Sequence, residues 1–181
     1  MDPATFLAIA LACAPQVHAE TARALVQVES DFNPWAIGVV GGALERQPQG
    51  RAEALATARA LRRAGWNFSV GLAQINVANV DRLGLNLEDA FEPCTNLASM
   101  QAVLRACFDR ASGTEPHARY PQAALRAALS CYYSGNFTTG RQQGYVHQVV
   151  RAALHQRPVP LPTTLPTPFP TALTTTPKEL P

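Results

Sequence analysis

The sequence has no block of charge of one sign, no long apolar segment and few aromatic residues. Of its 181 residues, 7% are aromatic and 15% are charged, and the formal net charge is +2. The arginines are scattered along the chain, so the sequence does not indicate a nucleic-acid-binding protein. The apolar run from Phe6 to Cys13 is too short to cross a bilayer, so we expect no membrane span.

The run from Phe6 to Cys13 has two interpretations. It could be the first helix of the core, or the apolar part of a signal peptide. Basic residues do not precede it, and Asp2 stands there instead, so it is a poor signal peptide. The sequence therefore leaves the export route open.

The cysteines and histidines do not follow a metal-binding pattern. The four cysteines contain no C-x-x-C pair, and the four histidines are not at metal-ligand spacing, so we predict neither a metal nor a cofactor. Cys94 and Cys107 lie near opposite ends of one expected helix, beyond the ~7 Å limit for a bridge. Two pairings remain, namely Cys13–Cys94 with Cys107–Cys131, or Cys13–Cys107 with Cys94–Cys131. Reduced, buried thiols are the alternative, whereas bridges would indicate an oxidising compartment.

Hydrophobic residues make up 47% of the chain, and Ala and Leu are abundant, which favours one helical domain over residues 1–157. Hydrophobic periodicity predicts helices at 2–13, 16–32, 51–64, 95–111, 121–133 and 143–155. The β-branched and Gly-Gly sequence within 37–44 predicts a small hairpin. After Gly71 we expect a helix that carries Gln74.

Residues 158–181 differ sharply in composition from the rest of the chain. They contain eight Pro and seven Thr among 24 residues. Such a segment cannot bury enough apolar surface to fold, so we predict a disordered, extended tail. It could be a spacer, a docking peptide for a partner, or an end without a function.

Glu29 stands out because it interrupts an apolar helical stripe. Ala22, Leu25, Val26 and Phe32 follow the spacing of one helix face and share it with Glu29, whereas Asp31 points the other way. Burial of a carboxyl raises its pKa, and a carboxylic acid that is protonated near neutral pH can act as a general acid. The alternative is a buried Glu that is satisfied by a local hydrogen bond.

Three short motifs occur in a characteristic order. They are Glu29-Ser30, the turn Gly71-Leu72-Ala73-Gln74, and Ala128-Leu129-Ser130-Cys131-Tyr132-Tyr133-Ser134-Gly135. In this order they resemble the lytic transglycosylase domain of the goose-type lysozyme superfamily. The type IV secretion-associated branch is the most similar, on three further segments: Gln27 to Val39, Gly65 to Ser69, and Pro93 to Leu97. The resemblance covers about residues 5–155.

The resemblance implies a mainly α, lysozyme-like α+β fold around a central catalytic helix. It implies a periplasmic enzyme that cleaves the β-1,4 bond between N-acetylmuramic acid and N-acetylglucosamine in peptidoglycan glycan strands. The product would be a 1,6-anhydro sugar, and the cut would open the wall for a type IV secretion system. Secretion-apparatus proteins are expected partners, through the tail. A muramidase that uses water and a non-catalytic glycan-binding assembly factor are the competing functions.

The resemblance also assigns roles to individual residues. Glu29 would protonate the glycosidic oxygen and then accept a proton from the 6-hydroxyl of the sugar. A second catalytic acid is not evident in the sequence. Ser30 would hold either the acetamido group of the substrate or the orientation of the acid.

The remaining motif residues are expected to bind the substrate. The backbone at Gly71 and Leu72, together with Gln74, would line sugar subsites, and Tyr132 would position Glu29 or stack near the scissile sugar. The family usually has Tyr-Asn where this chain has Tyr132-Tyr133, so either Tyr133 takes over contacts with the sugar or the local geometry differs from that of the family.

Overall fold

The computed structural model describes residues 1–115 and 117–155. The longer helices are α1 (Pro3–Cys13), α2 (Ala19–Ser30), α3 (Arg51–Arg63), α6 (Pro93–Ser112), α7 (Pro121–Ser134) and α9 (Tyr145–Leu154). The shorter ones are α4 (Val77–Arg82), α5 (Leu87–Ala90), α8 (Thr139–Gln142) and the 3₁₀ helix η1 (His117–Arg119). The predicted domain boundary at residue 157 and the predicted tail over residues 158–181 lie outside the described residues.

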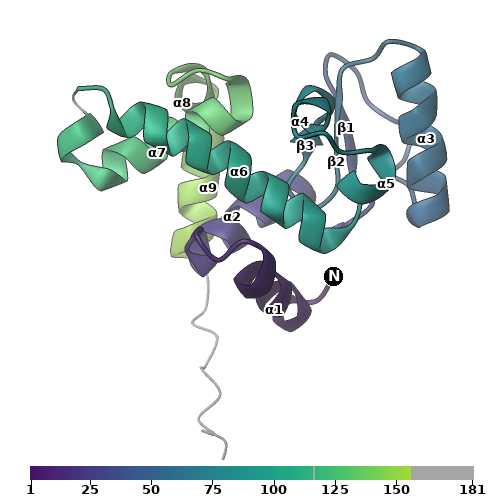
Figure 1. Cartoon of the computed structure of the whole chain (residues 1–181), viewed down its shortest axis with the longest axis horizontal. Coiled ribbons are helices and arrows are strands. Elements are labelled where there is room, and N and C mark those ends of the chain that lie inside the picture. Colours follow the sequence, from purple (N-terminus) through teal and green to yellow (C-terminus); the bar gives the residue numbers. More distant parts are fainter. Residues whose placement is uncertain (116, 156–181) are drawn as a thin grey trace, which may run out of the picture.

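The six longer helices confirm the helices predicted from periodicity, with small differences at their ends. A three-stranded antiparallel sheet completes the mainly α fold, in the order β1 (Ile37–Val39), β2 (Phe68–Val70) and β3 (Ile75–Asn76). Figure 1 shows α6 running across the molecule, with α7, α8 and α9 at one end and the sheet with α3, α4 and α5 at the other. Helix α6 thus connects a helical part to a part that contains the sheet.

Helix α1 is a core helix. Asp2 caps it by accepting hydrogen bonds from the backbone N–H groups of Ala4 and Thr5. Phe6 and Ala10 are buried in the main core. Of the two interpretations of the run from Phe6 to Cys13, the structure confirms the core helix. Among the described residues, no helix is both long enough and apolar enough to cross a membrane.

Two disulfides connect the helices. Cys13–Cys94 joins α1 to the first turn of α6, and Cys107–Cys131 joins α6 to α7. This is the first of the two pairings that the sequence allowed. Cys94 and Cys107 do lie on one helix, as predicted, which is why they do not pair with each other.

The hairpin predicted within 37–44 is wrong in its placement. Strand β1 pairs instead with β2, with Ile37 opposite Val70 and Val39 opposite Phe68. Gly41, at φ +73°, turns the chain away after β1, and helix α3 is inserted before the partner strand arrives. A hairpin does exist, but β2 and β3 form it.

The helix expected to carry Gln74 is also wrong. Gln74 lies in the turn between β2 and β3, with a positive φ of 48°. Helix α4 begins later, at Val77, where the side chain of Asn76 accepts a hydrogen bond from the N–H of Ala78. A positive φ at Gln74 is incompatible with a right-handed helix, so the turn geometry prevents an earlier start.

Candidate active site

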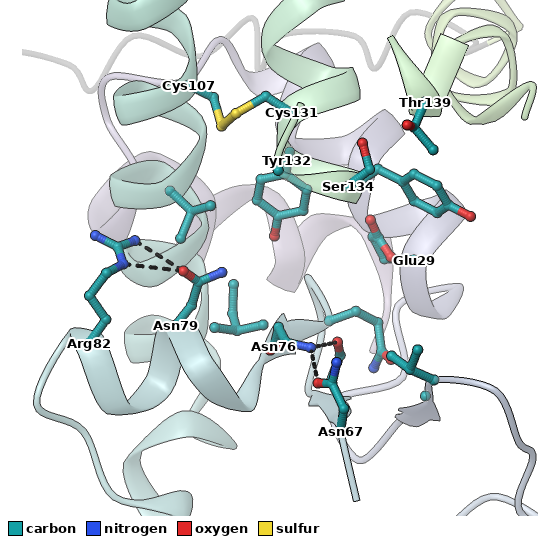
Figure 2. Close-up of a pocket in the computed structure, with 18 of the residues that line it drawn as sticks. Glu29, Asn67, Asn76, Asn79, Arg82, Cys107, Cys131, Tyr132, Ser134 and Thr139 are labelled. Carbon is teal, nitrogen blue, oxygen red and sulfur yellow. Dashed lines mark hydrogen bonds between the residues drawn. A yellow bond between two sulfur atoms is a disulfide. The ribbon is translucent and has the colours of Figure 1, made fainter. Parts of the chain in front are cut away.

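A groove of about 980 Å³ lies between the helical part and the part that contains the sheet. Residues of α6, α7 and the segment after α7 line one side, and residues of β1, β2, β3 and α4 line the other. Figure 2 shows Glu29 on one side of Tyr132, and Arg82 with Asn79 on the other. The groove is therefore elongated, with the predicted catalytic acid towards one side of it.

Glu29 occupies the last turn of α2 and is half-buried. Burial raises the pKa of its carboxyl to about 7, while a hydrogen bond from Tyr145 acts in the opposite direction. The hydroxyl of Tyr145 donates to Oε1 of Glu29 at 2.5 Å. At neutral pH a substantial fraction of Glu29 therefore carries a proton, as general acid catalysis requires.

The apolar stripe around Glu29 is confirmed along the helix. Ala22, Leu25 and Val26 are buried in α2. Phe32 lies beyond the end of the helix, yet its ring still packs against that of Phe6, with centroids 5.1 Å apart. Asp31 ends the helix in the left-handed conformation and is exposed. Among the described residues that line the groove, Glu29 is the only one with a carboxyl group.

Tyr145 is a site residue that the sequence reasoning missed. It begins α9, is 6% exposed and stacks on the ring of Tyr133, with centroids 4.6 Å apart. Its spacing of four residues from buried Val149 could have shown that it faces inward. The partner on which it acts, Glu29, is 116 residues away in the chain, and periodicity carries no information on such pairs.

Tyr132 and Tyr133 both line the groove, but Tyr132 forms no hydrogen bond with Glu29. The Tyr132 hydroxyl donates instead to the carbonyl oxygen of Ala73 at 2.6 Å. Burial, reinforced by the nearby charge of Glu29, holds the pKa of Tyr132 well above its usual value, so it remains a neutral donor. Tyr133 is 48% exposed and donates to the side-chain oxygen of Gln143 at 2.9 Å.

The turn between β2 and β3 presents Gln74 to the groove. Its side-chain amide donates to the carbonyl oxygens of Ala36 and Gly71, both at 3.0 Å, which fixes the side chain. The Ser30 hydroxyl donates to the carbonyl of Leu72 at 2.7 Å, and the Leu72 side chain is buried. Ser30, Gly71 and Leu72 thus hold the turn from behind, and the groove lining does not include them.

Asn96 is a second residue that the sequence reasoning did not single out. It is fully buried, accepts a hydrogen bond from the Ala73 N–H, and donates to the carbonyls of Val70 and Ala90. A Cβ on Gly71 would meet the Asn96 amide nitrogen at 2.3 Å. The Asn96 side chain therefore occupies the space that a side chain at Gly71 would need, and its hydrogen bonds fix the turn between β2 and β3. A polar residue among the buried positions of a helix was the available signal.

Polar side chains cover the sheet side of the groove. Asn67, Ser69, Asn76 and Asn79 line it, and Asn76 donates to the side-chain oxygen of Asn67 at 2.8 Å (Figure 2). Amides and hydroxyls offer both donors and acceptors to a ligand rich in hydroxyl and acetamido groups. In residues 1–115 and 117–155, His, Cys, Asp and Glu do not gather in any group of three or more that could hold a metal ion.

The arrangement supports acid–base chemistry by a single carboxyl group. Glu29 can donate a proton into the groove, and Tyr145 can stabilise the carboxylate that results. The turn between β2 and β3 is held by hydrogen bonds from three different helices, through Tyr132 of α7, Ser30 of α2 and Asn96 of α6. A groove of this volume, lined by many polar side chains, is suited to an extended polar polymer.

Comparison with known proteins finds related chains among type IV secretion proteins. The type IV secretion system protein virB1 of Brucella abortus biovar 1 is 49% identical over 153 residues, which cover 82% of this chain and 63% of that protein. The virB1 protein of Brucella suis biovar 1 gives the same values. Protein virB1 of Agrobacterium fabrum is 36% identical over 152 residues, which cover 83% of this chain and 60% of that protein.

The chain thus spans less than two thirds of the length of these relatives. No solved structure matches the chain significantly. The transglycosylase SLT domain matches residues 6–153, which include all three motifs and every residue described at the site. The chain therefore belongs to the transglycosylase SLT domain family.

Proposed function

We propose that this protein is a peptidoglycan lytic transglycosylase that cleaves the β-1,4 bond between N-acetylmuramic acid and N-acetylglucosamine. The observation that carries the proposal is Glu29, the one carboxyl among the described residues that line the groove, with a pKa of about 7. Glycosidases that use water usually need a second carboxylate ~5–9 Å from the first. A substrate that supplies its own nucleophile makes a second carboxylate unnecessary.

The reaction proceeds in two steps at Glu29. The protonated acid first transfers its proton to the glycosidic oxygen, and the bond between that oxygen and C1 of the muramic acid breaks. The acetamido group of the same sugar stabilises the electron-poor C1. The Glu29 carboxylate, held by the Tyr145 hydroxyl, then accepts the proton of the 6-hydroxyl as O6 forms a bond to C1. One bond breaks and one forms, so no water is consumed.

Other residues of the groove bind and orient the strand in this proposal. Gln74 and Tyr133 contact sugars directly, and Tyr132 keeps the turn against α7. Ser30 acts through the carbonyl of Leu72, so it positions the turn that carries Gln74. Gly71 and Leu72 contribute through the backbone of that turn.

Digestion of purified sacculi, followed by mass analysis of the products, tests the proposal. The wild type should release muropeptides with anhydro ends, which are lighter by one water than reducing ends. Glu29→Gln keeps the size of the side chain but has no acidic proton to give. The rate of release should therefore fall by about a thousandfold or more, since general acid catalysis alone contributes about 10²–10⁴-fold. Asp31→Asn makes the same chemical change two residues away, at an exposed position, and should behave as wild type.

Each competing function has its own outcome in this experiment. Reducing ends from the wild type would indicate a muramidase that uses water. A wild type that binds sacculi without cleaving them would indicate a glycan-binding assembly factor. Circular dichroism of both variants checks that the fold is unchanged.

We further propose that the cleavage opens the cell wall locally for a type IV secretion system, and that the protein acts in the periplasm. The virB1 relatives support the secretion context, and the two disulfides agree with an oxidising compartment. In a strain that lacks this protein, Asp31→Asn should restore assembly of the apparatus and Glu29→Gln should not. If both variants restored assembly, cleavage would not be needed for assembly, and this part of the proposal would be wrong.

A further inference from the structure

Two arginines line the same groove as Glu29. Arg82 ends α4, and Arg110 lies in the last turn of α6. Val103, Ala106 and Cys107 line the groove from the same helix, with the spacing of one helix face that leads to Arg110. The arginines therefore belong to the wall of the groove, although the cleavage chemistry at Glu29 makes no use of them.

Neither guanidinium is neutralised by a carboxylate within the part of the chain that the structure describes. Elsewhere on the described surface, Arg46, Arg51, Arg59, Arg62, Arg105 and Arg119 each pair with an Asp or Glu. Arg82 donates instead to the neutral side-chain oxygen of Asn79, through two nitrogens at 3.3 and 3.1 Å (Figure 2). Within residues 1–115 and 117–155, no carboxylate forms an ion pair with Arg82 or Arg110.

Arg110 is likewise held by neutral groups. Its Nη2 contacts the disulfide sulfur of Cys131 and donates to the carbonyl oxygen of Gly135 at 3.4 Å. The guanidinium carbon lies 5.6 Å from the centre of the Phe137 ring. These contacts orient the side chain and leave its charge intact, and Arg110 is exposed to solvent.

The groove therefore carries unpaired positive charge. The one carboxyl among its described lining residues, Glu29, is largely protonated below pH 7 and cannot balance two arginines. Exposed, oriented guanidinium groups bind carboxylates in a fork-like geometry and steer anions into a cleft. A bare sugar backbone gives them no charged partner, whereas the peptide stems attached to muramic acid carry free carboxylates.

We propose that Arg82 and Arg110 form a carboxylate-binding subsite that takes the peptide stems of the glycan strand. The inference rests on the proposed function and narrows its substrate to strands that carry peptides. Stem carboxylates held in this subsite fix the register of the strand relative to Glu29, so the subsite determines which linkage is cut.

The test compares soluble, uncrosslinked peptide-bearing strands with the same strands after chemical amidation of their carboxyl groups. The wild type should prefer the unmodified strands in kcat/KM. In Arg82→Gln with Arg110→Gln, the ratio between the two substrates should fall about tenfold, mainly through KM, as expected for the loss of two charge-assisted contacts. High salt should reduce the wild-type ratio in the same direction.

Arg63→Gln with Arg126→Gln is the matched control. These two arginines are also exposed and lack an ion-paired carboxylate among the described residues, but they do not line the groove. The control removes the same formal charge and should keep the wild-type ratio. An equal change in both double variants would overturn the subsite, because it would show an effect of net charge alone.

Two further arms separate the possible failures. Amidase-treated strands lose the peptides and expose the lactyl carboxylate of the sugar, so an equal effect of the arginine changes on them would overturn the assignment to the stem. Binding of unmodified and amidated strands is also measured in the Glu29→Gln background, with and without the arginine changes. If Glu29→Gln binds unmodified strands more tightly than amidated ones, and the arginine changes abolish this preference, the subsite is supported even if the wild type proves not to cleave. If Glu29→Gln shows no such preference, the subsite is refuted but the proposed cleavage activity is not.

Discussion

Glu29 is poised by two effects that oppose each other at one carboxyl group. Burial raises its pKa to about 7, and the hydrogen bond from Tyr145 lowers it. The net result is an acid that holds its proton near neutral pH but loses it readily once a glycosidic oxygen accepts it. A general acid and base in one residue needs a pKa close to the working pH, because it must exist in both forms during each turnover.

The first prediction concerns the dependence of kcat/KM on pH. In the proposed mechanism the free protein reacts only when Glu29 is protonated, so the rate should fall above about pH 7, approaching tenfold per pH unit. In Tyr145→Phe the carboxylate loses the donor that stabilises it, so the pKa of Glu29 should rise and the falling limb should move to higher pH. Rates of sacculus digestion between pH 5 and pH 9 measure the shift.

Tyr120→Phe is the control for this profile, because Tyr120 is 62% exposed and does not line the groove. A limb that moves to lower pH in Tyr145→Phe would contradict the proposed role of the Tyr145 hydroxyl.

At the scale of single residues, the sequence singled out Glu29 as the candidate acid but not Tyr145 as its hydrogen-bond partner. Glu29 was found because a carboxyl within an apolar stripe is visible over a few helical turns. Tyr145 and Asn96 act across 116 residues and 23 residues respectively, and no local pattern links such positions. Ser30 and Tyr132 were singled out by motif, but their hydrogen bonds to the carbonyls of Leu72 and Ala73 became known only from the structure.

The turn between β2 and β3 is the element on which the site depends most. Gly71 adopts φ +78° directly against Asn96, whereas Gly84 adopts φ +69° with no neighbour within 4 Å of a Cβ placed there. Both need the left-handed conformation, which costs other residues about 1–2 kcal/mol. At Gly71 alone, a side chain would also displace the amide that holds the turn.

The second prediction uses this pair of glycines. Gly84→Ala should lower the free energy of unfolding by about 1–2 kcal/mol and leave cleavage unchanged. Gly71→Ala should cost about 3 kcal/mol or more, because overpacking adds to the strain, and it should also impair cleavage through Gln74. Urea unfolding and sacculus digestion measure the two effects. Equal losses of stability in the two variants would mean that the Asn96 contact does not matter.

At the scale of elements, the helices and the presence of a small hairpin were predictable, but the pairing of the strands was not. An amphipathic or Ala-rich helix shows its period within its own sequence, so the six longer helices were identified from it. Helix α3 lies between strand β1 and its partner β2 in the sequence, so the pairing is not visible locally. The Gly-Gly segment after β1 resembles a hairpin turn. The position of Gln74 was missed because its side chain is held partly by Ala36, which is 38 residues away in the chain, as well as by Gly71 within the same turn.

The two disulfides differ in what they connect, which gives the third prediction. Cys13–Cys94 spans 81 residues and Cys107–Cys131 spans 24, so loop entropy predicts stabilisation by about 4.5 and about 3.5 kcal/mol respectively. Replacing each pair by serine should therefore cost more stability for Cys13–Cys94. Cleavage by the folded protein should fall more for Cys107–Cys131, since both of its cysteines line the groove.

Thermal or urea unfolding of each double variant, beside digestion assays well below the melting point, tests both halves of this expectation. A variant of Cys13 and Cys94 that loses cleavage while still folded would contradict it.

The fourth prediction concerns the segment from Pro158 to Pro181, whose composition differs from that of the domain. Removing it should leave sacculus digestion at the wild-type rate, because residues 6–153 contain the whole family match. Co-purification with secretion-apparatus proteins from the envelope should decrease, since we propose the segment as their docking peptide. A truncated protein that no longer cleaves sacculi would refute this division of roles.

The turn between β2 and β3 has one further consequence for the molecule as a whole. Its successive carbonyls, those of Leu72 and Ala73, are bound by Ser30 from α2 and by Tyr132 from α7. The turn, which belongs to the part that contains the sheet, is thus hydrogen-bonded to α2 and to α7, and a hinge motion that moved the turn away from these helices would have to break both bonds. The groove should therefore keep the same width with and without a glycan strand. Strands should be selected by how well they fit this preformed groove, and not by a conformational change after binding.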